Sequence, residues 1–166
     1  MIIIVSGLPG SGKSFFASRL ANMLDAAYVS SDLTSKDKDA LDKYSDFDKM
    51  AIYLTMADLT REKIRLGKNV VVDAIFHHHS LRDFFKELAQ ELHVPIYFIL
   101  IETTEDIAKK RLSERKDDIE TDYGLYISMK AKFEKYNFPH LTIQSANSNI
   151  EDMLSLATSY ISAIHE

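Results

Sequence analysis

Five short runs rich in apolar residues alternate along the chain with stretches that have helical periodicity. The runs are Ile2 to Val5, Ala27 to Val29, Val70 to Val72, Ile96 to Ile101 and His140 to Ile143. Most are apolar without alternation, as expected for strands that are buried on both faces. Such strands, separated by helices, predict an α/β fold: a parallel sheet of about five strands covered on both sides by helices.

The segments between these runs carry apolar residues at helical spacing. The expected helices are 15–24, 47–67, 81–92, 103–116, 126–133 and 150–164. Residues 32 to 46 are instead polar and mixed in charge, and we expect them to form a solvated, mobile excursion. Because no internal repeat and no linker interrupts the alternation, one domain is expected to span residues 1 to 166.

The composition excludes several classes of protein. The chain has 166 residues and no cysteine, which rules out a disulfide scaffold, a thiolate zinc site and a cysteine nucleophile. Its net charge of -5 gives no general tendency to bind nucleic acid or a membrane surface. The opening run from Met1 to Val5 is far shorter than the ~20 apolar residues of a membrane helix and lacks the features of a signal peptide. A cytoplasmic protein is therefore expected.

The turn after the first run has the pattern G-x-x-x-x-G-K-[S/T], which is typical of phosphate-binding loops. Gly10 and Gly12 let successive backbone N–H groups point inward, and the following helix adds the positive end of its dipole. Lys13 can reach the β- and γ-phosphates of ATP, and the Ser14 hydroxyl can bind Mg²⁺. A plain strand-to-helix turn would not explain Lys13 and Ser14 together. The residues predicted to bind the nucleotide here are Leu8, Pro9, Gly10, Ser11, Gly12, Lys13 and Ser14.

With this loop, the sequence resembles the P-loop kinase group of nucleoside-triphosphate-binding proteins. It is most similar to the small AAA-33-type kinases and to the kinase domains of polynucleotide 5′-hydroxyl kinases, over nearly the whole chain. The resemblance implies the three-layer P-loop nucleoside triphosphate hydrolase fold, with ATP and Mg²⁺ as the phosphoryl donor. It also implies a mobile, arginine-bearing lid, which would lie around residues 109 to 122.

Two aspartates follow predicted strands. Asp32 comes after the second strand, where the resembled kinases place the general base that accepts the proton of an acceptor hydroxyl. A helix-capping or solvated loop role is the alternative for Asp32. Asp73 ends the third strand and matches the Walker-B carboxylate, which would orient Mg²⁺ beside Ser14. The alternative is a cap of the next helix. In the resembled fold the first and third strands are neighbours, which would bring Asp73 to the phosphate-binding loop.

The segment from Lys109 to Lys116 holds five cations and one acid. Arg111 and Arg115 are four residues apart and therefore project from one helix face. In the resembled kinases an arginine-rich lid follows the fourth strand, so either residue could neutralise the transferring phosphate. A solvated, basic helix end is the alternative.

Three further features have open roles. The adjacent residues His77, His78 and His79 cannot share one helix face and lack the spacing of a metal site, so a loop or helix-entry role is expected. Arg82 is similar to an arginine that these kinases carry a few positions beyond the third strand, and an acceptor-side contact is one role considered for it. The loop 145–148 would border the adenine, or would simply connect two elements.

The leading hypothesis is a kinase that moves the γ-phosphate of ATP to a hydroxyl of a small molecule or of a nucleic-acid 5′ end. A nucleotide-dependent switch or slow ATPase that acts through a protein partner is the alternative, and a nucleoside monophosphate kinase is a third possibility. No membrane partner is expected, and the sequence does not specify the oligomeric state.

Overall fold

The computed structural model describes residues 1–34, 46–114 and 119–165. These residues include a sheet whose strands are all parallel and lie in the order β2-β3-β1-β4-β5. The strands are β1 (Ile2–Ser6), β2 (Ala27–Ser30), β3 (Val70–Asp73), β4 (Ile96–Glu102) and β5 (Leu141–Gln144). The predicted α/β fold is confirmed, and β1 and β3 are neighbours as expected.

Helices fill the intervals between the strands. They are α1 (Lys13–Met23), α2 (Ser31–Thr34), α3 (Asp46–Arg65), α4 (His79–Leu92), α5 (Glu105–Glu114), α6 (Ile119–Lys132) and α7 (Ile150–His165). The short α2 was not expected. It forms because Ser30 caps it. The Ser30 hydroxyl accepts a hydrogen bond from the Leu33 amide at 3.1 Å, and the Ser30 carbonyl accepts one from the Thr34 hydroxyl at 2.7 Å. Residues 35–45 of the predicted excursion lie outside the described residues.

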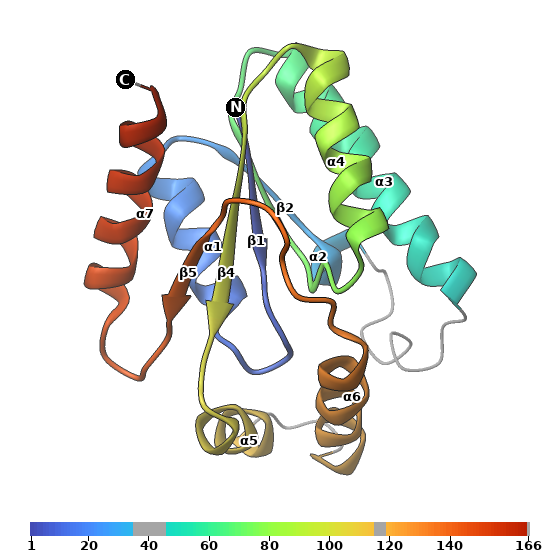
Figure 1. Cartoon of the computed structure of the whole chain (residues 1–166), viewed down its shortest axis with the longest axis vertical. Coiled ribbons are helices and arrows are strands. Elements are labelled where there is room, and N and C mark those ends of the chain that lie inside the picture. The colour runs from blue at the N-terminus through green and yellow to red at the C-terminus, as the bar shows by residue number, and fades with distance from the viewer. Residues whose placement is uncertain (35–45, 115–118, 166) are drawn as a thin grey trace.

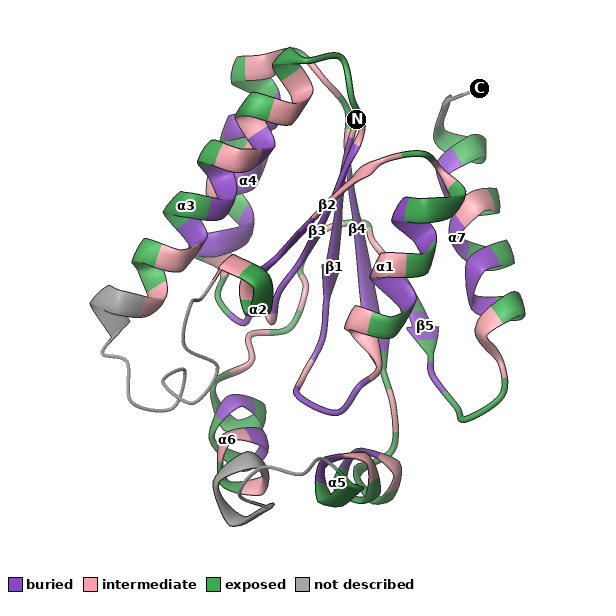
Figure 2. Cartoon of the chain, turned by 180° about the vertical axis from the view of Figure 1, so that it is seen from behind, coloured by how far each residue is buried: buried purple, intermediate pink, exposed green. Residues whose placement is uncertain are grey.

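The sheet is the middle of three layers (Figure 1). Side chains of β1 alternate between two apolar clusters, with Ile2 and Ile4 packed among residues of α3 and α4, and Ile3 and Val5 packed among residues of α1 and α7. Burial follows this arrangement: β1 and β3 are buried throughout, whereas β5, at the edge of the sheet, is buried only at Ile143. The outer faces of the helices are exposed (Figure 2). Burial between two layers of helices therefore explains why the sequence of β1 is apolar without alternation, as expected.

The carboxyl ends of the strands form one edge, below which α5 and α6 lie (Figure 1). Asp73 is in register with Ser30 on one side and with Val5 on the other. The last residues of β2 and β3 and the start of the loop after β1 therefore meet at this edge. In α/β sheets this edge is where ligands bind.

Candidate active site

The loop between β1 and α1 has the backbone of a phosphate-binding turn. Gly10 and Gly12 have φ angles of 77° and 89°, in the left-handed region that favours glycine. A Cβ atom on Gly12 would also lie 3.0 Å from the Arg111 guanidinium and 3.0 Å from the Ser145 hydroxyl. Helix α1 begins at Lys13 with no side-chain cap, so its first amides are left for another partner. An anion is the partner that this arrangement favours.

Asp73 lies against this loop and is almost fully buried, with 2 % of its surface exposed. Its Oδ2 accepts a hydrogen bond from the Tyr28 hydroxyl at 2.5 Å, whereas its Oδ1 is buried and has no partner among the described residues. Burial raises the pKa of Asp73, while the Lys13 ammonium and the hydroxyls of Tyr28 and Ser14 act in the opposite direction. The structure thus brings Lys13, Ser14 and Asp73 together, as the resemblance implied.

Asp32 is exposed on α2, directly after β2. It is close enough to Asp73 for its charge to raise the pKa of that carboxyl group. Because Ser30 caps α2, the capping role considered for Asp32 is filled by another residue. The Asp32 carboxylate forms no hydrogen bond or ion pair with any other described residue. Nor does Asp73 cap a helix, since α4 begins after His78.

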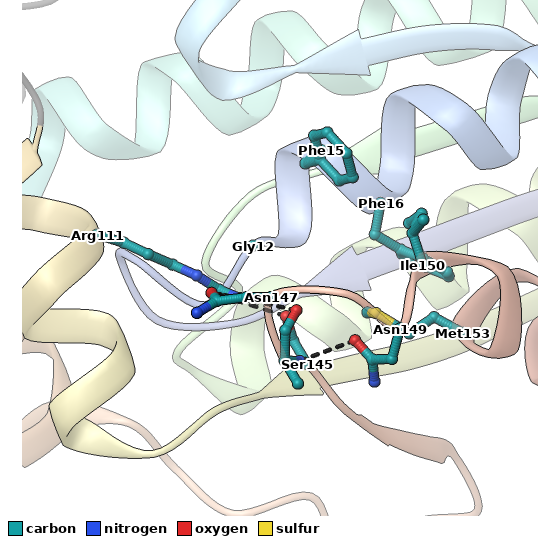
Figure 3. Close-up of a pocket in the computed structure, with 10 residues that line it drawn as sticks. Gly12, Phe15, Phe16, Arg111, Ser145, Asn147, Asn149, Ile150 and Met153 are labelled. Carbon is teal, nitrogen blue, oxygen red and sulfur yellow. Dashed lines mark hydrogen bonds between the residues drawn. The ribbon is translucent and has the colours of Figure 1, made fainter.

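Arg111 projects from α5 onto the phosphate-binding loop and onto the loop after β5 (Figure 3). Its Nη1 donates to the Gly10 carbonyl and to the Ser145 hydroxyl, at 3.2 Å each. Its Nη2 donates to the Ala146 carbonyl at 3.1 Å and to Asn147 Oδ1 at 3.4 Å. Arg111 is therefore not a solvated helix-end cation. It joins the two loops that border one pocket.

That pocket has a volume of about 310 Å³ and lies beside the start of α1 (Figure 3). It is lined by Gly12, Phe15, Phe16, Arg111, Ser145, Ala146, Asn147, Asn149, Ile150 and Met153. The loop 145–148, considered for the adenine, forms one wall of it. An apolar pocket with a few polar groups is typical of a small-molecule site. Arg115 and part of the expected lid at 109–122 lie outside the described residues.

Two of the three histidines, His78 and His79, have a side-chain partner at the edge. Glu134, which follows α6, places its Oε1 2.6 Å from His78 Nδ1 and its Oε2 3.2 Å from His79 Nε2. The hydrogen bond with His78 lowers the pKa of Glu134. Arg82 donates to the Glu134 carbonyl at 2.6 Å and to the Phe76 carbonyl at 2.9 Å. These contacts fasten the end of α6 to the loop between β3 and α4, in agreement with the loop or helix-entry role expected for the histidines.

Arg82 is fully buried, with 0 % of its surface exposed. Its guanidinium carbon lies 3.8 Å from the centroid of the Tyr136 ring, and the Tyr136 hydroxyl lies 2.7 Å from the Ser6 hydroxyl. Burial lowers the pKa of Arg82, while Tyr136 and Glu134 oppose this change. An arginine whose polar groups are used in this way is held inside the protein. The acceptor contact considered for Arg82 would require it to leave these partners.

Several residues of the edge were not identified from the sequence. Tyr28 gives no signal beyond its place in a strand, yet its hydroxyl binds Asp73. Glu134 and Tyr136 lie in a segment with no regular periodicity, and their partners are 50 or more residues away, at separations such as 56 and 130. Only the three-dimensional arrangement reveals them.

Acid is expected to destabilise the fold through His77. Burial, followed by the positive charges of neighbouring groups, lowers the pKa of His77 from 6.5 to about 4. The unfolded chain binds this proton near pH 6.5 and the folded chain only near pH 4, so the free energy of unfolding falls as the pH is lowered between these values. Between pH 7 and pH 5 the loss is about 2 kcal/mol.

Urea unfolding of His77→Asn at pH 7 and pH 5 measures this contribution. Between pH 7 and pH 5, the free energy of unfolding of the variant should fall by about 2 kcal/mol less than that of the unsubstituted protein. His93→Asn, at an exposed position, should keep the pH dependence of the unsubstituted protein. An equal pH dependence in His77→Asn and the unsubstituted protein would contradict the assignment.

The strand order and the loop after β1 define a fold of the P-loop kinase class. The chain belongs to the AAA_33 family, described as an AAA domain, whose profile matches residues 2–135. No helix in the described part of the chain is long and apolar enough to span a bilayer.

Solved structures support the fold. A sugar kinase from Janibacter sp. is 17% identical, with a TM-score of 0.76 over 97% of this chain and 94% of that chain. A gluconokinase from Sinorhizobium meliloti is 16% identical, with a TM-score of 0.75 over 98% and 91%. An APS kinase from Mycobacterium tuberculosis, in complex with AMPPNP and APS, is 17% identical, with a TM-score of 0.72 over 97% and 96%. At these identities the likeness concerns the fold alone.

Proposed function

We propose that this protein is an ATP-dependent phosphotransferase that moves the γ-phosphate of ATP to a hydroxyl group. The observation that carries the proposal is the convergence of Lys13, Ser14 and Asp73, with Asp32 nearby, at one edge of the sheet. Nucleotide binding by the APS kinase of similar fold supports ATP as the donor. Its acceptor, and those of the sugar kinase and gluconokinase, make a small hydroxylated molecule the favoured acceptor here.

In this scheme the loop amides and Lys13 bind the phosphates of ATP. The adenine of ATP lies in the pocket beside Phe15, where Arg111 holds the two bordering loops in place. We assign Arg111 to the nucleotide side of the site, because its guanidinium contacts Gly10 and the loop after β5. Arg115 stays a candidate for contact with the transferring phosphate.

The donor set fits Mg²⁺. Asp73 offers a buried oxygen atom with no partner among the described residues, and Ser14 offers a hydroxyl group beside it. Carboxylate and hydroxyl oxygens are ligands that suit this cation, which takes its remaining ligands from water and phosphate. Bound there, Mg²⁺ would neutralise the phosphate charge that develops during transfer. Such a cation would also favour the charged form of Asp73, whose pKa burial raises.

Asp32 acts as the general base. Its carboxylate accepts the proton of the acceptor hydroxyl, the hydroxyl oxygen forms a bond to the γ-phosphorus, and the bond from that phosphorus to the β–γ bridging oxygen breaks. ADP leaves with the electron pair of that bond. An exposed carboxylate without a protein partner can come within hydrogen-bond distance of an acceptor hydroxyl. Proton transfer to the carboxylate requires this contact.

Asp32→Asn is expected to lower the rate of transfer by a factor on the order of 10² while leaving ATP affinity unchanged, because the amide cannot accept the proton. Isothermal titration with AMPPNP and Mg²⁺ measures the affinity, and release of ADP with an acceptor panel measures the rate. Asp25→Asn is the matched control, since Asp25 is exposed after α1 and has a positive φ of 49° that asparagine tolerates. Full activity in Asp32→Asn would remove the base assignment.

The same panel tests the proposed function. It should contain sugars, sugar acids, nucleosides, nucleoside monophosphates and a 5′-hydroxyl oligonucleotide. ATP-dependent phosphorylation of any hydroxyl acceptor supports the kinase, and the acceptor that reacts decides between a small molecule and a nucleic-acid end. ATP binding with only slow hydrolysis, accompanied by nucleotide-dependent capture of a protein, would instead favour a switch.

A further inference from the structure

The loop between β3 and α4 holds a residue in a backbone conformation that is unusual for its type. Phe76 has a φ of 52°, in the left-handed region, which costs a bulky residue roughly 1–3 kcal/mol. Two contacts stabilise it: the Phe76 amide donates to the Tyr53 hydroxyl at 3.0 Å, and its carbonyl accepts from Arg82 Nε at 2.9 Å. Residues from two helices therefore fix the backbone of Phe76 and, with it, the orientation of the next residue, His77.

His77 has an unused hydrogen-bonding atom. Only 8 % of its surface is exposed, and its Nδ1 is buried with no partner among the described residues. A buried polar atom without a partner costs free energy, so its retention in a fixed loop requires a reason. Because the pKa of His77 is lowered to about 4, the imidazole is neutral near pH 7 and has one donor and one acceptor nitrogen.

Two lysines approach His77 from different helices. Lys132 ends α6, two residues before Glu134, whose amide donates to the His77 carbonyl at 2.8 Å. Lys49 lies one helical turn before Tyr53, on the same face of α3, and Tyr53 binds the residue before His77. The positive charges of both lysines lower the pKa of His77, as does that of Arg82. In the described part of the chain, neither lysine forms an ion pair.

His77 lies in the loop that follows the carboxyl end of β3, and the phosphate-binding loop and Asp32 follow the carboxyl ends of β1 and β2. Helix α6 lies below this edge of the sheet (Figure 1). Two unpaired cations and an imidazole with an unused nitrogen are complementary to an anion that also carries hydroxyl groups. Glu134, two residues after Lys132, is already paired with His78 and His79. It therefore does not neutralise the lysines through an ion pair.

We infer that Lys49, His77 and Lys132 bind the acceptor, and that this acceptor is a small hydroxylated anion such as a sugar acid or a sugar phosphate. The inference rests on the proposed function and specifies the substrate class of the same site. A polynucleotide is disfavoured as the acceptor, because its binding needs a row of phosphate contacts, whereas the chain has a net charge of -5 and the cluster has two lysines. The lysines bind the anionic group, and His77 forms a hydrogen bond with the acceptor.

Paired acceptors that differ only in charge test the inference. Suitable pairs are D-gluconate with D-glucitol, D-glycerate with glycerol, and glucose 6-phosphate with glucose, each with ATP and Mg²⁺. The anionic member of at least one pair should have the higher kcat/KM, by about 10-fold or more, as expected when one charge-assisted contact is lost. Lys132→Gln should raise the KM for that anion by about 10-fold and leave the KM for ATP unchanged.

Lys135→Gln is the matched control, because Lys135 is exposed, lies three residues from Lys132, and forms no ion pair among the described residues. It should leave the KM for the anion unchanged. Equal or better use of the neutral acceptors, reaction of the 5′-hydroxyl oligonucleotide alone, or an unchanged KM in both Lys49→Gln and Lys132→Gln would overturn the inference.

A binding measurement separates this inference from the proposed function. The imidazole ¹⁵N signals of His77, followed by NMR with AMPPNP and Mg²⁺ present, should shift when an anionic acceptor is added and should not shift with its neutral partner. Binding of the anion at His77 without any phosphate transfer would retain the anion site and overturn the kinase. Transfer to a neutral acceptor with no change at His77 would retain the kinase and overturn the anion site. No response and no transfer with any of the three anions would overturn the inference as well.

Discussion

Replacing Lys13 by alanine is expected to slow phosphate transfer by a factor on the order of 10² to 10³, about 3 to 4 kcal/mol of transition-state stabilisation. In the proposed scheme the Lys13 ammonium group binds the phosphates. Lys13 is also the first residue of α1, where the free amides favour an anion. Its loss has a second effect. Lys13 lowers the pKa of Asp73, so the variant shifts that carboxyl group further toward its neutral form and weakens the proposed cation site.

Titration with AMPPNP and single-turnover kinetics measure the two effects of Lys13→Ala. Lys68→Ala is the control, since Lys68 is exposed and precedes β3, at the opposite end of the strand from Asp73. Thermal unfolding without nucleotide should be similar for both variants. If Lys13→Ala retained the affinity and the rate of the unsubstituted protein, the proposed phosphotransferase would be wrong.

Replacing Arg82 by methionine is expected to lower the free energy of unfolding by about 3 kcal/mol. Methionine fills a similar volume, so the loss comes from hydrogen bonding. The carbonyls of Phe76 and Glu134 would lose their donor, at about 1–3 kcal/mol for each buried acceptor left unsatisfied. The contact of the guanidinium with the Tyr136 ring would be lost as well.

Urea unfolding at pH 7 measures the effect, with Arg65→Met as the control. Arg65 has 66% of its side chain exposed and makes one long ion pair of 4.0 Å, so its replacement should change the free energy of unfolding by less than about 0.5 kcal/mol. Arg82→Met should also broaden the backbone signals of residues 76 and 134, because both lose their common partner. Similar stabilities of the two variants would show that the Arg82 contacts contribute little.

The sequence predicted the fold because its main signals are local. Unbroken apolar runs indicate strands buried on both faces, and the sheet shows that β1 is buried in this way from Ile2 to Val5. The phosphate-binding loop is likewise a local pattern, and its glycines have the positive φ angles that such a turn requires. Asp73 was found because a strand end is also visible in the sequence.

Long-range contacts were out of reach for the same reason. The resemblance implied a lid that carries Arg111, and the spacing placed Arg111 and Arg115 on one helix face. The sequence did not reveal the partners of Arg111, which lie 34 to 36 residues away in the loop after β5 and 101 residues away in the phosphate-binding loop. Arg82 was considered for an acceptor-side contact, and it is buried because residues 133–136 cover it. Neither the loop after β5 nor the segment 133–136 has a periodic pattern from which these contacts could be predicted.

The hydrogen bond between Ser6 and Tyr136 joins residues that are 130 positions apart. During synthesis on the ribosome, the phosphate-binding loop and Asp73 emerge well before Glu134 and Tyr136. A nascent chain that ends after α4 therefore contains the strands β1, β2 and β3. Its Arg82 guanidinium and Ser6 hydroxyl still lack Glu134 and Tyr136, the later partners that bury them. The carboxyl edge of the sheet is completed only when the segment after α6, strand β5 and the loop 145–148 have been added, so the candidate site forms after most of the described elements have been synthesised.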